Sequence, residues 1–499
     1  MSDDTTGAVE YDDIQGLVRY GYGKLTQASF LLLKVRDAAL ARAWLAGCPV
    51  SSAREQSPPP RTVLQVALSC AGLRALGLNE EIVQGFSREF LGGMSSDDSR
   101  SRRLGDLGVN APARWQWGGN AEAVPHVMLM LYAMPGELEA WQQQILDQCS
   151  PGFDLMRCLG TSDMDNTEPF GFADGISQPS LDWARRRPVR DAELLDYTNL
   201  SCLGEYLLGY PNEYGEYTDR PLLRDELDPE GRLPRAEESP ERADLGRNGS
   251  YLVIRQLHQD VGGFWRHLDE AAGGDAAQRE ELAAAMVGRT RDGTPLVGES
   301  GARIDGGEQP LNRFTYQDDP RGLRCPVGAH IRRSNPRNAD LPPGGRGPIA
   351  RLVRTLGFDA DALAGDMVSS TRFHRLLRRG REYGQALPIE RALAGEDGGP
   401  GGTGLHFICL GANIARQFEF VQGAWMAGTH FGGLHNESDP LLGNRMPGPD
   451  GDPTDGFSMP TESGCDVHLA GLPQFVRVVG GAYFFLPGIR ALRFLAKEP

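Results

Sequence analysis

The sequence of 499 residues contains no apolar run as long as the ~20 residues that a membrane-spanning helix requires. Its longest apolar stretches, such as Ala28–Val35 and His126–Met134, have the length of β-strands. The start, MSDDTTGAVEYDD, is acidic and lacks both the basic and apolar regions of a secretory signal and the twin arginines of a Tat signal. We therefore expect no membrane partner and a cytoplasmic location.

Basic residues are also in short supply. Lys and Arg number 51 against 67 Asp and Glu, which gives a formal net charge of −16. This excess of negative charge repels a phosphate backbone and argues against nucleic acid as a partner, so small molecules are the expected ligands. The eight cysteines include no C-x-x-C pair, and we expect them to be reduced and mostly buried.

Several catalytic signatures are absent. The sequence has no H-E-x-x-H, no G-x-S-x-G and no P-loop, so zinc proteolysis, serine-elbow hydrolysis and nucleotide phosphoryl transfer lose their usual motifs. A G-x-G-x-x-G pattern at 399–404 precedes an apolar strand instead of following one, which reverses the order found in a dinucleotide site.

What the chain does have is the composition of a globular protein, with 40% apolar and 24% charged residues. Its length predicts two to four folded units at about 100 to 200 residues per domain. Strands are expected at 28–35, 62–69, 126–132, 249–256 and 405–410. Helices are expected at 37–45, 135–148, 262–272, 276–287 and 414–426. Because the second half repeats the order of the first, we predict an α+β fold of two related halves.

The segment PFGFADGISQP places Asp174 between two glycines, Gly171 and Gly175. D-G and isolated glycines are turn signals, so a plain turn is one interpretation. The other is that the glycines let the backbone approach a ligand closely and hold one carboxylate beside it. Apolar neighbours would then raise the pKa of that carboxylate and suit it to proton transfer.

Two basic segments have the same two interpretations. In CPVGAHIRRSNPR, small residues precede His330, and Arg332 and Arg337 follow it, which is either an ordinary basic loop or a site for a planar, anionic ligand. In FHRLLRRGREYG, strand alternation puts Arg378 and Arg379 on opposite faces. One arginine must therefore point inward, where it needs an anion or a polarised oxygen.

These three segments, in this order, resemble the dye-decolourising peroxidase family of haem proteins. GFADG matches the family's G-x-x-D-G signature, GAHIRRSNPR resembles its proximal-histidine segment, and RLLRRGREYG resembles its distal-arginine segment. Similar segments near the start, at 248–261, at 404–425 and near the end extend the resemblance over almost the whole chain.

The resemblance implies a duplicated ferredoxin-like fold of the dimeric α+β barrel type, with antiparallel sheets and haem b in the C-terminal half. We expect an N-terminal domain at 1–170 and a haem-binding domain at 171–499. Residues 203–247 lack periodicity and are expected to form a surface insertion. A second insertion is expected near 338–370, with a helical segment at 348–356. Both insertions indicate the longer branch of the family.

By the same resemblance, His330 is the proximal iron ligand. Asp174 is the distal acid and base, and Arg378 stabilises charge during peroxide cleavage, with Arg379 as the alternative. Contacts to the haem are also expected from Gly171, Gly175 and Arg332. An acceptor for the second nitrogen of the proximal imidazole is required, and Asn413 and Glu419 are the candidates.

The implied function is a peroxidase that reduces hydrogen peroxide and oxidises phenolic or dye-like organic donors. The alternative is a haem-binding or haem-handling protein with little turnover, which would need neither Asp174 nor Arg378. The physiological donor and the oligomeric state stay open.

Overall fold

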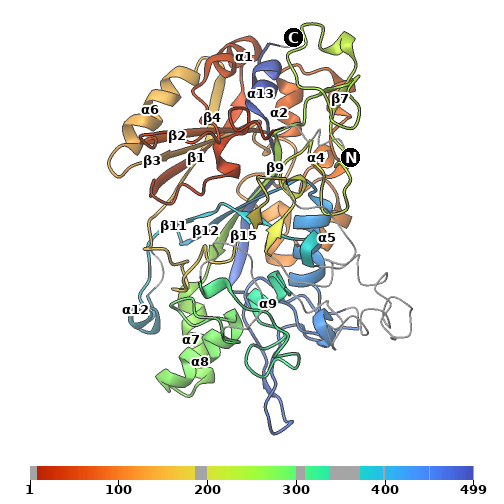
Figure 1. Ribbon diagram of the computed structural model, residues 1–499. Helices are drawn as coiled ribbons and strands as arrows, with labels where there is room; N and C mark the ends of the chain where they lie inside the picture. Colours follow the sequence, from red (N-terminus) through yellow and green to blue (C-terminus); the bar gives the residue numbers. More distant parts are fainter. Residues whose placement is uncertain are drawn as a thin grey trace, which may run out of the picture.

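The computed structural model describes residues 8–185, 199–298, 310–337, 371–396, 399, 401–448 and 450–497. Its main feature is a nine-stranded sheet in the order β10-β12-β9-β15-β2-β3-β1-β4, with β11 also paired to β12 (Figure 1). The first half of the chain supplies β1 (Gln27–Val35), β2 (Thr62–Leu68), β3 (Val127–Ala133) and β4 (Phe153–Gly160). The second half supplies β9 (Ser250–Gln259), β10 (Leu377–Arg378), β11 (Arg381–Tyr383), β12 (Gly404–Gly411) and β15 (Val476–Leu486).

The two halves have the same strand topology. Read from its last strand, the first half has the order β4-β1-β3-β2, and the second has β15-β9-β12 followed by β10 and β11. Both are therefore the order 4-1-3-2, and the strand pairs within each half are antiparallel. The predicted duplicated ferredoxin-like α+β fold is confirmed.

The helices lie on or beside this sheet. They are α1 (Ala38–Gly47), α2 (Cys70–Ala75), α3 (Glu80–Val83), α4 (Arg88–Gly92), α5 (Asp98–Leu104), α6 (Leu138–Cys149), α7 (Val261–Ala271), α8 (Ala276–Val287), α9 (His330–Ser334), α12 (Ile389–Leu393) and α13 (Ile489–Leu495). Side-chain caps start several of them: Asp37 accepts a hydrogen bond from Leu40 N, and Asp260 accepts one from Gly263 N. The segment predicted as a helix at 414–426 is π-helical, as η10 (Ala415–Glu419) and η11 (Val421–Met426).

The sheet has two apolar faces because apolar residues occupy successive positions along the strands. The inner face buries Phe30, Met130, Ile254 and Phe484 in one cluster. The sheet curls around this cluster, since the Phe30 ring on β1 lies 5.8 Å from the His406 ring on β12. His406 Nε2 also lies 3.0 Å from Gly160 O at the end of β4. The far ends of the sheet therefore meet, as in a barrel.

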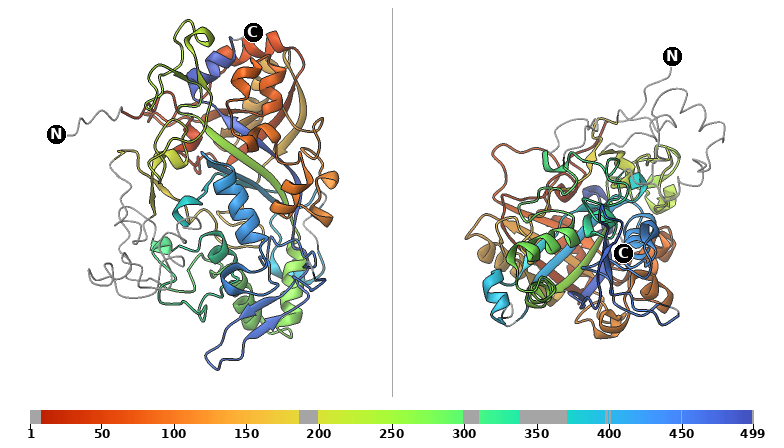
Figure 2. Two further views of the ribbon diagram at one scale, coloured as in Figure 1. Left: turned by 90° about the vertical axis from the view of Figure 1, so that its right-hand side faces the viewer. Right: turned by 90° about the horizontal axis from the view of Figure 1, so that it is seen from below.

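The two halves are joined by more than the sheet. Helix α13 returns to the first half and packs beside α1, where Arg493 donates to Leu45 O and Cys48 O (Figure 1). At the opposite end of the molecule, the hairpin of β13 (Phe457–Met459) and β14 (Val467–Leu469) projects outward (Figure 2). The domain boundary at 170 stays a prediction.

The first insertion is only partly a surface feature. Residues 203–247 form short elements, among them β7 (Leu222–Leu223) and β8 (Ala243–Asp244). However, Leu203, Tyr206 and Tyr210 are buried in the inner cluster, so the expectation of a surface loop is wrong for the start of this segment. The second predicted insertion, with its helical segment at 348–356, lies outside the described residues.

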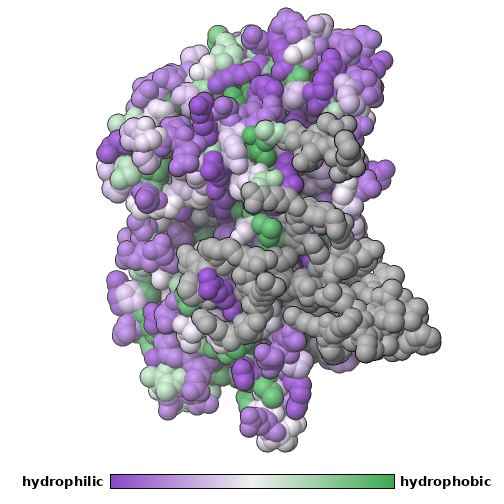
Figure 3. Space-filling model, in the orientation of Figure 1, coloured by the Kyte–Doolittle hydropathy of each residue, from purple (hydrophilic) through white to green (hydrophobic). Residues whose placement is uncertain are grey.

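Polar side chains predominate on the coloured part of the face drawn in Figure 3. On the face drawn in Figure 3, apolar residues are scattered among hydrophilic ones over the coloured part of the surface. Across the described residues, no helix has the length and apolarity needed to span a bilayer.

Six of the eight cysteines are buried, as expected, and Cys158 and Cys465 are exposed. The cytoplasmic location stays a prediction.

Candidate active site

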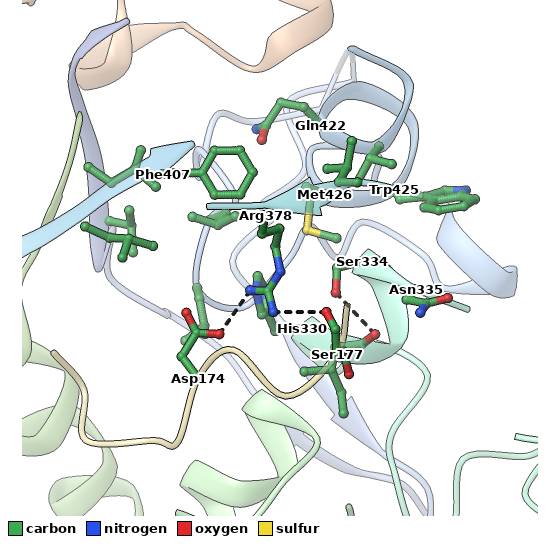
Figure 4. Close-up of a pocket in the computed structure, with 18 of the residues that line it drawn as sticks. Asp174, Ser177, His330, Ser334, Asn335, Arg378, Phe407, Gln422, Trp425 and Met426 are labelled. Atoms are coloured by element: carbon green, nitrogen blue, oxygen red, sulfur yellow. Dashed lines mark hydrogen bonds and ion pairs between the residues drawn. The ribbon is translucent and has the colours of Figure 1, made fainter. Parts of the chain in front are cut away.

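A cavity borders the outer face of the sheet in the second half of the chain (Figure 4). The volume in which the centre of a water molecule fits is about 260 Å³. Strands β9, β10, β12 and β15 form one wall, and the segment at 172–179, helix α9 and η11 form others. The first half of the chain also contributes to the lining, through residues 104–106 and 110. Apolar lining residues include Phe172, Leu257, Phe407, Trp425, Met426 and Val478.

His330 is the first residue of α9 and lines this cavity. Its Nδ1 lies 3.1 and 3.2 Å from the two carboxylate oxygens of Asp439. Burial alone would lower the pKa of His330, but the Asp439 carboxylate outweighs it, so the pKa is raised. Within the described part of the chain, Nε2 makes no hydrogen bond, which leaves this nitrogen available to a ligand in the cavity.

Asp439 is therefore the hydrogen-bond partner of the His330 imidazole, and neither Asn413 nor Glu419 is. Glu419 instead pairs with Arg100 and accepts a hydrogen bond from Tyr483 OH, and Asn413 Oδ1 accepts one from Arg416 N in η10. Asp439 is fully buried in the S-D-P-L-L turn and also accepts from the backbone N–H groups of 441 and 442. The only local signal for it was a carboxylate in an apolar turn, 109 residues after the histidine.

The two arginines after His330 hold α9 in place. Arg332 donates to Asp319 and to the carbonyl of Cys325, and it lies outside the cavity lining. Arg333 is buried and donates to the carbonyls of Trp425, Gly428 and Glu437. The expectation that Arg332 contacts the cofactor is therefore corrected, because its guanidinium faces the loop that supports the helix.

Asp174 and Arg378 form an ion pair inside the cavity. Arg378 Nη1 lies 3.0 Å from Asp174 Oδ1, and Nη2 donates to Ser177 O at 3.3 Å (Figure 4). Burial would raise the pKa of Asp174, as the sequence led us to expect, but the Arg378 charge together with the hydrogen bonds from Gly175 N and Arg378 outweighs burial, and the pKa is lowered. Asp174 is therefore a carboxylate at neutral pH. Arg379 points to the opposite face, where it donates to Leu17 O and Val18 O.

The two predicted glycines serve the turn and lie outside the cavity lining. Gly171 and Gly175 have φ of 93° and 76°, a region that side chains with a Cβ rarely adopt. The N–H of Gly175 donates to Asp174 Oδ1 at 2.6 Å, so the turn orients the carboxylate. The structure assigns both glycines a role in backbone conformation, and their contact with a cofactor stays a prediction.

A third part of the cavity is positively charged. Arg289 and Arg337 both line it and both donate to Ser177 Oγ. Burial, together with the Arg337 charge, lowers the pKa of Arg289 to about 10. This corner favours a ligand with anionic groups. The sequence indicated Arg337 through its segment, but nothing in the pattern around Arg289 did.

The residues present fit haem. No cluster of three or more His, Cys, Asp or Glu suited to a metal occurs in the part of the chain that the structure describes. A metal in this cavity would therefore have His330 as its protein ligand and would need its other donors from a porphyrin. The apolar walls suit the ring faces, and the arginine corner suits the ring carboxylates.

The chain resembles known proteins along nearly its full length. No protein-family model matches it. It is 26% identical to dye-decolorizing peroxidase msp1 of Mycetinis scorodonius, over 98% of this chain and 88% of that protein. It is 32% identical to multifunctional dye peroxidase DyP2 of Amycolatopsis sp., over 50% of this chain and 49% of that protein.

Solved structures share the fold. A decolorizing peroxidase from Auricularia auricula-judae matches with a TM-score of 0.70 at 24% identity, covering 98% of this chain and 100% of that chain. A dye-decolorizing peroxidase in complex with 2,6-dimethoxyphenol matches with a TM-score of 0.70 at 22% identity and the same coverage.

Proposed function

Because the chain belongs to the dye-decolorizing peroxidase family, a family of haem enzymes, we propose that it binds haem b, reduces hydrogen peroxide and oxidises phenolic or dye-like donors. The observation that carries this proposal is that one cavity is lined by His330 and by the Asp174–Arg378 ion pair. A protein that only binds haem needs the histidine, but it has no use for a carboxylate and a guanidinium held together beside it.

His330 would ligate the iron through Nε2. Asp439 accepts a hydrogen bond from Nδ1–H. This hydrogen bond fixes the orientation of the ring and makes Nε2 a stronger electron-pair donor to a metal. Arg289 and Arg337 would bind the carboxylates of the haem. When bound, the haem supplies the redox chemistry that splits the peroxide O–O bond.

Asp174 would act as the base and then the acid. As a carboxylate, it would take a proton from one oxygen of hydrogen peroxide and return it to the other, so that water can leave when the O–O bond breaks. Arg378 holds Asp174 in place and lies where it can stabilise the negative charge that develops on the oxygens. Gln178 supports this position, since its Oε1 accepts from the N–H of Arg378 at 3.0 Å.

Phenolic donors are proposed from one neighbour, the dye-decolorizing peroxidase whose structure holds 2,6-dimethoxyphenol. A donor screen on the purified holoenzyme, with phenols and dyes compared at equal haem concentration, tests this part.

The cofactor is tested by absorption spectroscopy on the full chain with added hemin. We expect a Soret band that His330→Ala abolishes or shifts, with His468→Ala as the matched control because His468 is an exposed histidine on β14 outside the cavity lining. No Soret band, or one that His330→Ala leaves unchanged, contradicts haem binding. A normal Soret band without peroxide turnover would favour the haem-handling alternative.

A further inference from the structure

A second carboxylate, Glu168, lines the cavity six residues before Asp174. It lies at the start of the turn that carries Asp174, and the two side chains are close enough for their charges to interact. The mechanism above does not use it.

Glu168 is held by three N–H groups. Its Oε1 accepts from Phe172 N at 3.0 Å, and its Oε2 accepts from Phe170 N at 3.1 Å and from Gln259 Nε2 at 2.8 Å. Two of these donors belong to its own turn, and the third extends from β9. The carboxyl group is therefore fixed in position whichever of its protonation states is present.

Gln259 brings a second, independent observation. It also lines the cavity and is only 7% exposed. Its buried Oε1 accepts no hydrogen bond from any residue that the structure describes. A buried acceptor without a donor is costly, so this oxygen requires a proton donor in some state of the protein, either a water in the cavity or a protonated Glu168 reached by rotation of the amide.

We propose that Glu168 and Gln259 form a second proton-holding site beside Asp174, which takes protons from water in the cavity and passes them to Asp174 during turnover. This inference rests on the proposed peroxidase function. Reduction of one hydrogen peroxide to two waters consumes two electrons and two protons. The electrons come from the organic donor, and the protons must reach the cavity separately when the donor does not enter it.

The transfer is balanced at each group. Glu168 in its acid form gives its proton to the Asp174 carboxylate and becomes a carboxylate that Gln259 Nε2 stabilises. It regains a proton that bulk solvent delivers through the cavity water, which leaves that water neutral, and rotation of the amide then lets Gln259 Oε1 accept from the new O–H.

The surrounding charges keep the two carboxyl groups in different states. Burial raises the pKa of Glu168 to about 7, against its three N–H donors, and the charge of Asp174 adds to the increase. Arg378 keeps Asp174 ionised. From the other elements, Glu168 faces neutral Gln259 on β9 and the more distant His330 on α9. A proton donor thus lies beside a base, which is the arrangement that proton transfer needs.

Glu168→Gln tests this in the full-length holoenzyme, with Glu382→Gln as the matched control. Glu382 on β11 also interacts with the charge of Asp174 and also has a raised pKa because of burial, but it lies outside the cavity lining. We expect the infrared difference spectrum across neutral pH to lose a protonated-carboxyl band in Glu168→Gln and to keep it in Glu382→Gln. Steady-state turnover with a large dye should lose an ionisation near neutral pH in the first variant only.

A second variant keeps Glu168 itself. Gln259→Leu removes a donor to the ionised form, so the midpoint of the Glu168 band should move to higher pH. The inference is overturned if the band persists in Glu168→Gln, if both Gln variants lose it equally, or if the band is lost while the pH profile of turnover is unchanged. The infrared result does not require activity, so an inactive holoenzyme contradicts the proposed function and leaves the infrared test of Glu168 intact.

Discussion

The two halves of the sheet have one strand order, but they use their outer faces in opposite ways. In the first half, Leu31, Leu64 and Leu129 on this face are fully buried in the core that the helices cover. In the second half, Leu405 and Phe407 on the same face are only half-buried, because they border the cavity. The inner faces do not differ in this way, since both are buried in one cluster.

This difference shows how one copy of the repeated fold can provide a ligand-binding cavity while the other copy provides a filled core. The strands can stay apolar, and the walls that replace the covering helices carry the polar and charged groups of the cavity: the turn of Asp174, the one-turn helix of His330 and the arginine corner. A cavity in place of a core forgoes packing energy, and a bound cofactor that fills the space restores it. The second half should therefore be sensitive in activity where the first half is sensitive in stability.

The largest expected effect tests whether the chemistry is confined to the second half. Asp174→Asn keeps the size of the side chain but removes the base, so the reaction with peroxide should slow by about 10²- to 10⁴-fold while haem stays bound. The control is Asp154→Asn on β4, an exposed residue paired with Arg36 at 3.0 Å. Stopped-flow rates measure both variants, and equal rates for wild type and Asp174→Asn would refute the role of Asp174.

The next largest effect concerns a buried ion pair that joins the two halves of the chain. Asp106 from the first half and Arg255 on β9 form a buried, two-pronged ion pair, with 1% and 3% of the residues exposed. Asp106→Ala leaves a buried guanidinium without its partner and should cost about 3 to 5 kcal/mol in the free energy of unfolding.

Asp12→Ala, which removes an exposed ion pair, is the control for Asp106→Ala. The Asp12–Arg54 pair has side chains that are 71% and 70% exposed, so its loss should cost no more than about 1 kcal/mol. Urea unfolding measures both variants. Equal losses would mean that the buried pair does not hold the halves together.

A matched pair of leucines compares the two outer faces directly. Leu129→Ala on β3 opens a hole in a filled core and should cost about 2 to 5 kcal/mol. Leu405→Ala on β12 enlarges an existing cavity, so in the haem-free protein it should cost about 1 kcal/mol or less. Thermal unfolding of both variants tests this, and equal costs would mean that the second face is packed as tightly as the first.

Removing the partner of His330 should have a smaller effect that is limited to the second half. Asp439→Asn retains an acceptor but removes the negative charge, which should weaken haem affinity or activity by about 10- to 100-fold. Hemin titration measures it, with Asp319→Asn near the other end of the helix support as the control. A larger loss of affinity in the control would show that the position of α9 matters more than the charge on His330.

The sequence allowed much of the first half to be predicted, because its strands and helices follow hydrophobic periods. The same method missed β4 and β15, since β4 alternates poorly and β15 contains two glycines. Asp174, His330 and Arg378 stand in distinctive segments, and the structure brings these three residues together in one cavity, although their roles stay predictions. Asp439 and Glu168 were not assigned a role, because turns have no period and partners distant in sequence leave no local trace.

Arg332 was assigned wrongly for a different reason. Adjacent side chains on a one-turn helix point in different directions. The sequence of such a short helix does not show which of these side chains faces the ligand. Only the supporting loop around Asp319 decides that Arg332 faces away.

The smallest effect concerns the pH dependence of the peroxide step. The folded pKa of Asp174 is lowered below its usual 3.8, so ionised Asp174 stabilises the fold above the unfolded pKa, and this stabilisation is lost as the pH falls through the folded value. The base form therefore persists into the acid range, and the rate with peroxide should stay level from about pH 7 to about pH 4. Arg378→Lys keeps a positive charge but holds the carboxylate less well, so the acid limb should move to higher pH. Stopped-flow rates over this range measure the limb, and a rate that rises steadily from about pH 5 to about pH 9 would contradict a carboxylate base.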